Sequence, residues 1–352
     1  MNNRSVKLTR REFLKLLAAA SAGVTLASCG GGKTPISDQS QPVTAETQPE
    51  FPKATQQTNE KMTTQGSQPT QSEALQPTQQ SSMEQAYLSV VRGDDPVAIT
   101  MAAMAAIGGI ERFVKNGADV IIKPNICTDY HTYEYAATTN PQVVATLVRL
   151  CLGAGAKRVR VMDQPFGGTP KSAYAMSGIA DAVSAAGGQM EVMNHNKYEK
   201  VPIPNGRDIT EGLFYKDILE ADVMINVPIA KTHGLARLTL GGKNLLGVIA
   251  NPGRMHANLG QRIADLISLV KPTLTVVDAV RILMDNGPTG GNLADVRQTN
   301  TIIASHDIVA ADAYATTLFG LTGKDISYIQ AAADMGLGTI DLNSIKIEEI
   351  SV

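Results

Sequence analysis

The sequence predicts an α/β fold: a mainly parallel sheet with helices on both faces, leaving open an inserted or appended second lobe. From residue 86 onward, short runs rich in Val and Ile alternate with amphipathic helical runs, an order typical of parallel sheets covered on both faces. The 352 residues are 43% hydrophobic with a formal charge of -2, as in ordinary globular proteins of one or two domains. No repeat of fixed period is visible.

The predicted elements follow one another in βα order. Strand-like runs are 119-DVIIKP-124, 158-RVRVMD-163, 189-QMEVMN-194, 222-DVMINVP-228, 273-TLTVVDAV-280 and 300-NTIIAS-305. Helix-like runs include 141-PQVVATLVRLCLGAGA-156, 261-QRIADLISLV-270 and 307-DIVAADAYATTLFG-320. The strand runs are short and β-branched, and the helix runs carry the 3.6-residue apolar period.

Residues 1–29 are expected to be an export signal. Basic residues precede the apolar stretch 16-LLAAASAGVTLAS-28, which is too short to span a bilayer but suits a signal h-region. The stretch 9-TRREFLK-15 resembles the twin-arginine signal, a receptor-read address that implies passage through the twin-arginine translocase in the folded state. The following 26-LASC-29 resembles a lipobox, in which Cys29 carries lipid. The alternative is an ordinary buried cysteine near a cleaved signal.

Residues 30–85 are rich in Gln, Thr, Ser and Pro with few large apolar side chains. Such a segment cannot bury enough surface to offset its ordering entropy, so we expect a disordered tether. With Cys29 lipidated, residues 86–352 would form an extracytoplasmic α/β domain anchored to the bacterial membrane. The near-neutral charge and the lack of Trp argue against nucleic acid as a partner.

Polar side chains gather at the predicted strand ends, which meet at one edge of a parallel sheet, where ligands bind. They are Lys123, Asn125, Asp163, Lys231, His233, Asp278 and Asp307. The aspartates have an alternative role as helix caps. The lysines lack that alternative, because a cation gains nothing at a helix N-terminus. We therefore expect the strand ends to form a binding site.

The segment 228-PIAKTHGLARLTLGGKNLLGVIANPGRMHAN-258 contains no Asp or Glu. Besides Lys231 and His233 it holds Arg237, Lys243, Arg254 and His256. Gly241 and Gly242 permit positive φ or close backbone approach, and Lys243 and Asn244 follow at an expected helix start, which predicts an anion cradle. No Walker loop or GxGxxG is present. The alternative is a solvated basic loop. A second loop, 285-DNGPTGGN-292, fits a lid or only a turn.

Seven motifs, in order and spacing, resemble domain of unknown function family 362 over residues 87–340: 122-IKPNIC-127, 138-TTNPQVVATLV-148, 157-KRVRVMDQP-165, 221-ADVMINVPIAKTH-233, 240-LGGKNLLGVI-249, 286-NGPTGG-291 and 307-DIVAADAYAT-316. Some members add an iron-sulfur module. No such cluster is expected here, because only Cys127 and Cys151 remain beside Cys29. These two form either a disulfide or two buried thiols.

The family fold is also distantly similar to half of the lactate racemases, which use a nickel-pincer cofactor held by a lysine and histidines. That resemblance implies only a hypothesis for Lys231 and His233. The metal and the cofactor stay unknown.

Three functions remain open. In the first, the protein is an enzyme that acts on an anionic small molecule, and a metal or metal-organic cofactor is left open. Lys123, Asn125, Lys231, Gly241, Gly242, Lys243, Asn244 and Arg254 would bind ligand; His233, His256, Asp163 and Asp278 would be catalytic, the histidines moving protons and the aspartates holding a metal or a histidine. In the second, a tethered lipoprotein binds a solute or cofactor without catalysis. In the third, the basic segment of an envelope scaffold faces lipid headgroups.

Overall fold

The computed structural model describes residues 87–352, which fall within one compact unit. The predicted signal peptide (1–29), the tether (30–85) and the lipidation site at Cys29 lie outside the described residues. No helix among the described residues has the length and apolar character needed to cross a membrane.

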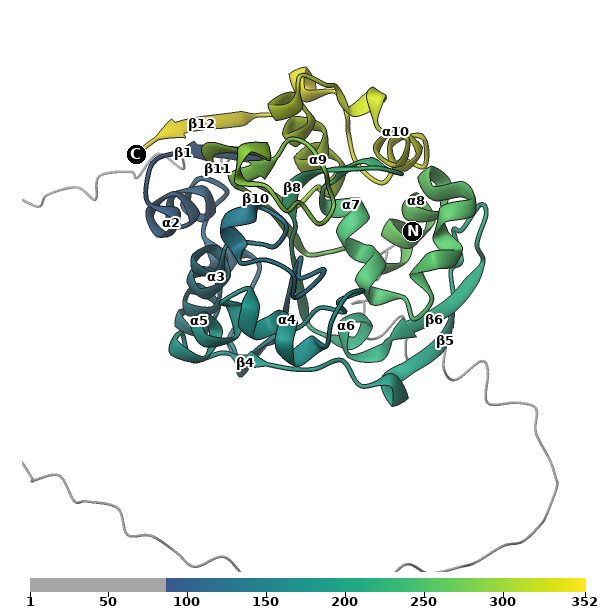
Figure 1. The fold of residues 1–352 in the computed structure, drawn as a ribbon, viewed down its shortest axis with the longest axis horizontal. Coiled ribbons are helices and arrows are strands. Elements are labelled where there is room, and N and C mark those ends of the chain that lie inside the picture. The colour runs from purple at the N-terminus through teal and green to yellow at the C-terminus, as the bar shows by residue number, and fades with distance from the viewer. Residues whose placement is uncertain (1–86) are drawn as a thin grey trace, which may run out of the picture. The chain divides into compact units, whose positions relative to one another are not determined.

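A large mixed sheet forms the centre of the fold, with strand order β12-β1-β11-β10-β7-β2-β3-β4. Figure 1 labels β12, β1, β11, β10 and β4 of this sheet. Its strands are β1 (Leu88–Arg92), β2 (Asp119–Pro124), β3 (Arg158–Val161), β4 (Gln189–Met190), β7 (Val223–Val227), β8 (Ile229–His233), β9 (Arg237–Thr239), β10 (Leu274–Leu283), β11 (Val296–Ser305) and β12 (Ile347–Ser351). Most neighbouring pairs are parallel; β11 runs antiparallel to both β1 and β10, and β9 antiparallel to β8. The predicted mainly parallel α/β class is confirmed.

Helices cover both faces of the sheet (Figure 1). They are α2 (Pro96–Ala106), α3 (Pro141–Gly153), α4 (Pro170–Met176), α5 (Ile179–Ala185), α6 (Lys216–Glu220), α7 (Gly241–Asn244), α8 (Leu259–Val270), α9 (Ile308–Thr316) and α10 (Ser327–Asp334). Two separate apolar cores result, because α2, α3 and α5 pack with one face, and α8, α9 and α10 pack with the other. Burial on both faces explains why the central strands are almost continuously apolar.

The helices begin where the sequence supplies caps. Asn140 accepts a hydrogen bond from the backbone N–H of Gln142 at the start of α3, and Pro141 occupies the first helical position. Asp307 accepts from Val309 and Ala310 at the start of α9. The capping role considered for Asp307 is therefore the one the structure shows.

Outside the main sheet, β5 (Tyr198–Pro202) and β6 (Glu211–Tyr215) form a two-stranded antiparallel sheet. Among the described elements, this hairpin is the best match to the second lobe that the sequence left open as a possibility. It shares a core with α8, because Phe214 and Tyr215 are fully buried in the same apolar cluster as Ile263 and Ile267. The hairpin is therefore an extension of the single unit.

The strand pairing changes at the carboxyl end of β2, where the chain passes from β7 to β8. Strand β2 pairs with β7 up to Pro124 and Val227. Beyond Pro228 the chain continues as β8, which pairs with β10 and β9. Because β8 leaves β2 at this point, the carboxyl ends of β2 and β3 and the side chains of β8 border a common space.

Candidate functional site

A cavity of about 560 Å³ opens where β8 diverges from β2, at the carboxyl edge of the sheet. Its wall combines residues of β2, β8, β9 and α7 with residues of the segments that follow β2, β3 and α7. These include eight of the predicted site residues: Lys123, Asn125, Asp163, Lys231, His233, Lys243, Asn244 and His256. The volume lies in the range of small-molecule sites. Residues at or near the ends of β2, β3 and β8 thus meet at one cavity, whereas Asp278 and Asp307, from the other two predicted strand ends, do not line it.

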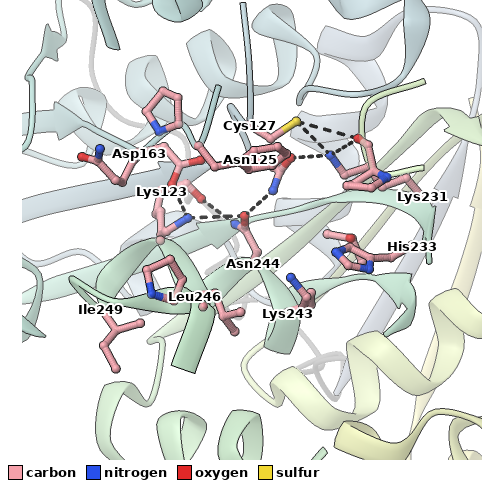
Figure 2. Close-up of a pocket in the computed structure, with 18 of the residues that line it drawn as sticks. Lys123, Asn125, Cys127, Asp163, Lys231, His233, Lys243, Asn244, Leu246 and Ile249 are labelled. Atoms are coloured by element: carbon pink, nitrogen blue, oxygen red, sulfur yellow. Dashed lines mark hydrogen bonds and ion pairs between the residues drawn. The ribbon is translucent and has the colours of Figure 1, made fainter. Parts of the chain in front are cut away.

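Lys123 and Asp163 form a buried ion pair on one side of the cavity (Figure 2). Lys123 Nζ lies 2.5 Å from Asp163 Oδ1, and both side chains are almost completely buried. Asp163 Oδ2 also accepts a hydrogen bond from the backbone N–H of Ile126 at 2.7 Å. Burial lowers the pKa of Lys123, and Asp163 opposes that shift. Asp163 thus pairs with a lysine rather than with His233 or a metal.

A chain of amide hydrogen bonds connects this pair to the second strand-end lysine (Figure 2). Asn244 Oδ1 accepts from Lys123 Nζ at 3.3 Å and from Asn125 Nδ2 at 2.8 Å. Asn125 Oδ1 in turn accepts from Lys231 Nζ at 2.9 Å. Asn226, inside strand β7, fixes Asn244 by accepting from its Nδ2 at 2.9 Å. The connected amides hold both lysines in defined positions.

Lys231 is only 1% exposed and its ammonium is surrounded by neutral acceptors. Besides Asn125 Oδ1, the carbonyl oxygens of Ala137 and Pro288 lie 2.6 and 2.9 Å from Nζ. An ammonium has three N–H groups, so these three acceptors use all of them. Lys231 therefore provides the cavity with a fixed positive charge rather than with a free donor.

The loop 285–292 supplies one of these acceptors. Its Pro288 carbonyl holds Lys231, and Gly290 N–H donates to the Asn286 carbonyl within the loop. The sequence left open whether this loop is a lid or a turn. Its described contacts are those of a turn that supplies one of the three acceptors of Lys231.

Lys243 also lines the cavity, and its Nζ makes no hydrogen bond or ion pair with any residue from 87 to 352. Its side chain is partly buried. Burial, followed by the positive charge of Lys231, lowers the pKa of Lys243 from 10.5 to about 8. Lys243 is thus a cation at neutral pH that faces the cavity without a counterion from the described chain.

His233 is held in one tautomer by the turn after β8. Its Nδ1 accepts hydrogen bonds from the backbone N–H groups of Leu235 and Ala236, at 3.1 and 3.3 Å. The ring proton consequently resides on Nε2. Burial, with the charges of Lys243 and Lys231, lowers the pKa of His233 to about 4. At neutral pH His233 is a neutral N–H donor, which fits a ligand-binding role better than the predicted proton-moving role.

The predicted anion cradle at Gly241 and Gly242 is filled by the protein itself. Their backbone N–H groups donate to Asp312 Oδ1 and Oδ2, at 2.7 and 2.8 Å. A Cβ at Gly241 would lie 2.7 Å from Asp312 Oδ1, so the glycine is needed for close approach, not for positive φ. Burial raises the pKa of Asp312 to about 7, while the two N–H donors oppose that rise. The prediction that these N–H groups meet a ligand was wrong.

Two further predicted residues do not reach the cavity. Asp278 is 1% exposed, and its carboxylate accepts from the backbone N–H groups of Asn140 and Val280 at 2.7 and 3.0 Å. It stabilises the start of α3 and does not line the cavity, so the prediction that it lies across the pocket was wrong. Arg254 is exposed and outside the lining, whereas its neighbour His256 lies in the lining and is also exposed.

The metal hypothesis finds no ligand set in the described residues. Within 87–352, no three His, Cys, Asp or Glu side chains form a group able to hold a metal ion. The idea that Lys231 holds a cofactor does not fit either, because three acceptors already occupy its amino group.

Some lining residues escaped sequence reasoning. Cys127 lines the cavity, and its Sγ lies 3.4 Å from Lys231 Nζ. Cys127 and Cys151 are both buried free thiols, so of the two predicted alternatives the structure shows thiols and no disulfide between them. Thr239 Oγ1 and Gln164 Oε1 line the cavity and are buried without a hydrogen-bond partner in the described chain. The signals available were weak: Thr239 ends a short strand, and Cys127 follows Asn125 in a loop.

The fold and site define an α/β protein with a lysine-lined cavity at the carboxyl edge of its sheet. The chain belongs to the family described as domain of unknown function (DUF362), whose model matches residues 120–317. Thylakoid-associated protein sll1697 of Synechocystis sp. is 28% identical over 248 residues, covering 66% of this chain and 72% of the relative.

Two solved structures show limited similarity. The lactate racemase apoprotein of Thermoanaerobacterium thermosaccharolyticum has a TM-score of 0.41 and 12% identity, over 65% of this chain and 56% of that chain. A protein from Thermotoga maritima has a TM-score of 0.34 and 13% identity, over 65% of this chain and 60% of that one. This chain therefore spans less than two thirds of either solved chain.

Proposed function

We propose that the cavity binds a small anionic molecule, a carboxylate or a phosphate, and that the protein is an enzyme acting on it. The observation that carries the proposal is Lys243, a partly buried ammonium with no counterion among residues 87–352. Removing a charge from water is costly unless it is paired. Lys123 has Asp163, and Lys231 has three carbonyl oxygens. A bound anion would give Lys243 the partner it lacks.

The remaining lining complements such a ligand. The Nε2–H of His233 and the unpartnered hydroxyl of Thr239 are available donors. Leu246 and Ile249 give the cavity an apolar wall on the side opposite His233 (Figure 2). Phe166, which is 65% exposed, also lines the cavity. A ligand with an anionic end and an apolar substituent would satisfy both regions. A lysine whose pKa lies near neutral pH favours catalysis over binding without catalysis.

The test is a thermal-shift titration of the full-length protein with orthophosphate and with lactate at pH 7. Lys243→Ala is expected to weaken binding by roughly 30-fold or more, the loss of about 2 kcal/mol for one charge-assisted contact. Lys324→Ala, at an exposed position, is the matched control and should bind as the parent does. If neither anion stabilises the parent more than it stabilises Lys243→Ala, the anion site is wrong.

We also propose that the domain is exported and anchored to a membrane through Cys29. The support is the tandem of a twin-arginine-like stretch and a lipobox-like stretch in residues 9–29, and the Synechocystis relative is named as thylakoid-associated. Replacing both Arg10 and Arg11 by Lys should retain the precursor in the cytoplasm, and Cys29→Ala should abolish lipid labelling. Normal export of the double-lysine precursor would contradict the proposal.

A further inference from the structure

We propose that Lys243 is a covalent catalytic residue, whose amino group forms a Schiff base with the carbonyl carbon of a small 2-oxo acid. The inference rests on the proposed anion site and deepens it, by naming the reacting group and the substrate class. It follows from the different surroundings of the three lysines that line the cavity.

Only one of these three lysines has an available nitrogen. Lys123 Nζ is ion-paired with Asp163 at 2.5 Å, and the three N–H groups of Lys231 are used by carbonyl oxygens. Lys243 Nζ has no acceptor in residues 87–352, so its nitrogen can approach an electrophile without breaking a hydrogen bond to the described chain. An amine that attacks a carbonyl must be able to lose a proton and to approach the carbon, and contacts that hold an ammonium in place oppose both.

The backbone of Lys243 is fixed, which a covalent residue requires. The preceding Gly241 and Gly242 are clamped to the buried carboxylate of Asp312, and Gly241 also accepts a hydrogen bond from Asn226 Nδ2 at 3.0 Å. The following Asn244 is buried and hydrogen-bonded to Asn226 and Asn125. Lys243 thus projects from a rigid turn while its own amino group stays free, so ligand geometry can be set by the scaffold.

The protonation state also suits nucleophilic attack. Burial and the fixed charge of Lys231 hold the pKa of Lys243 at about 8, against 10.5 for an ordinary lysine. At pH 7 about a tenth of Lys243 is then the neutral amine, roughly 300 times the fraction in an ordinary lysine. A desolvated lysine beside a second cation is a recurrent way to activate an amine.

The step balances without another reactant. The neutral amine of Lys243 attacks the carbonyl carbon, a C–N bond forms, and the carbonyl oxygen takes a proton to give a carbinolamine. The C–O bond then breaks, water leaves, and the nitrogen becomes a protonated imine after net uptake of one proton from solvent. No oxidant or reductant is needed, and hydrolysis reverses the step.

A 2-oxo acid fits the arrangement of charges. Its carboxylate lies next to its carbonyl carbon, so an anion held by the field of Lys231 and by the Nε2–H of His233 would present the carbonyl to Lys243. The substituent on the other side of the carbonyl would extend toward Leu246 and Ile249. Apolar 2-oxo acids are therefore expected to react better than dicarboxylic ones.

The experiment traps the imine by reduction. The full-length protein is incubated with sodium cyanoborohydride and glyoxylate, pyruvate, phenylpyruvate or 2-oxoglutarate at pH 7, digested, and mapped by mass spectrometry. The expected result is a reduced adduct on the Lys243 peptide at least roughly tenfold above that on the Lys324 peptide, given the difference in neutral amine. Lys243→Arg keeps a cation at this position and should lose the adduct, whereas Lys324→Arg, at an exposed position, should keep the adduct on Lys243.

Two measurements test this inference separately from the proposed function: the pH dependence of Lys243 labelling and the binding of lactate. The preference for Lys243 over Lys324 should narrow toward pH 10, where ordinary lysines also lose protons. If lactate stabilises the protein but no 2-oxo acid labels Lys243 above Lys324, the Schiff base is wrong and the anion site stands. If lactate and phosphate also fail to bind, the proposed function has failed as well.

Discussion

Breaking the Lys123–Asp163 pair should be strongly destabilising. In Lys123→Met the carboxylate of Asp163 stays buried with only the N–H of Ile126, and in Asp163→Asn the ammonium of Lys123 stays buried without its counterion. Removal of one partner from a buried pair typically costs about 3 to 5 kcal/mol. At about 2 to 4 °C per kcal/mol for a domain of this size, the midpoint of thermal unfolding should fall by roughly 6 to 20 °C.

The assay is urea unfolding of the parent, both single variants and the double variant. The double variant should be less destabilised than the sum of the single variants, by more than about 1 kcal/mol, because no lone charge remains. The control is the exposed pair Lys200–Glu211, whose atoms lie 2.7 Å apart with side chains 67% and 58% exposed. Lys200→Met should cost less than about 1 kcal/mol. Equal and small losses at both pairs would refute the reasoning.

Two further predictions follow from the same cavity. The pKa of His233 is lowered from 6.5 to about 4, so the unfolded state takes up its proton first and the stability due to His233 is lost as the pH falls from 6.5 toward 4. His233→Asn keeps an acceptor for the two N–H groups, and its urea midpoint should fall less than the parent's between pH 7 and pH 4; parallel curves would contradict the shift. A Cβ at Gly247 would lie 2.5 Å from Asp163 Oδ1 and 2.9 Å from Lys123 Nζ, whereas one at Gly234 meets nothing within 4 Å. Gly247→Ala should therefore lower the melting temperature and Gly234→Ala should not, a difference that differential scanning calorimetry would detect.

The sheet and part of the site were predictable because they depend on local patterns. The run 119–124 is β2 itself, and the other predicted runs overlap β3, β4, β7, β10 and β11. Since carboxyl ends of parallel strands share one edge, Lys123 and Asp163 were expected together, and they are. Lys231 reaches the same cavity from a strand of its own, β8, which the sequence did not separate from β7.

The wrong predictions concern residues whose contacts join segments far apart in the chain. Asp278 was placed at a strand end, but β10 continues to Leu283 because it pairs with β11 and β8 over that length. The N–H groups of Gly241 and Gly242 were expected to meet a ligand, but a carboxylate from α9, 71 and 70 residues away, accepts them. Asp312 is an acid inside an apolar helical run, and that was the only signal in the sequence. Which acceptor a backbone donor meets is decided by packing.

The most direct test of the anion site is calorimetric titration of lactate into the full-length parent and Lys243→Ala at pH 7 and pH 9. With a pKa of about 8, Lys243 is mostly protonated at pH 7 and mostly neutral at pH 9, so the parent's affinity should fall by about tenfold between them. Lys243→Ala should bind weakly at both values. Equal affinity of the parent at both pH values, or unchanged affinity in Lys243→Ala, would contradict an anion site centred on Lys243.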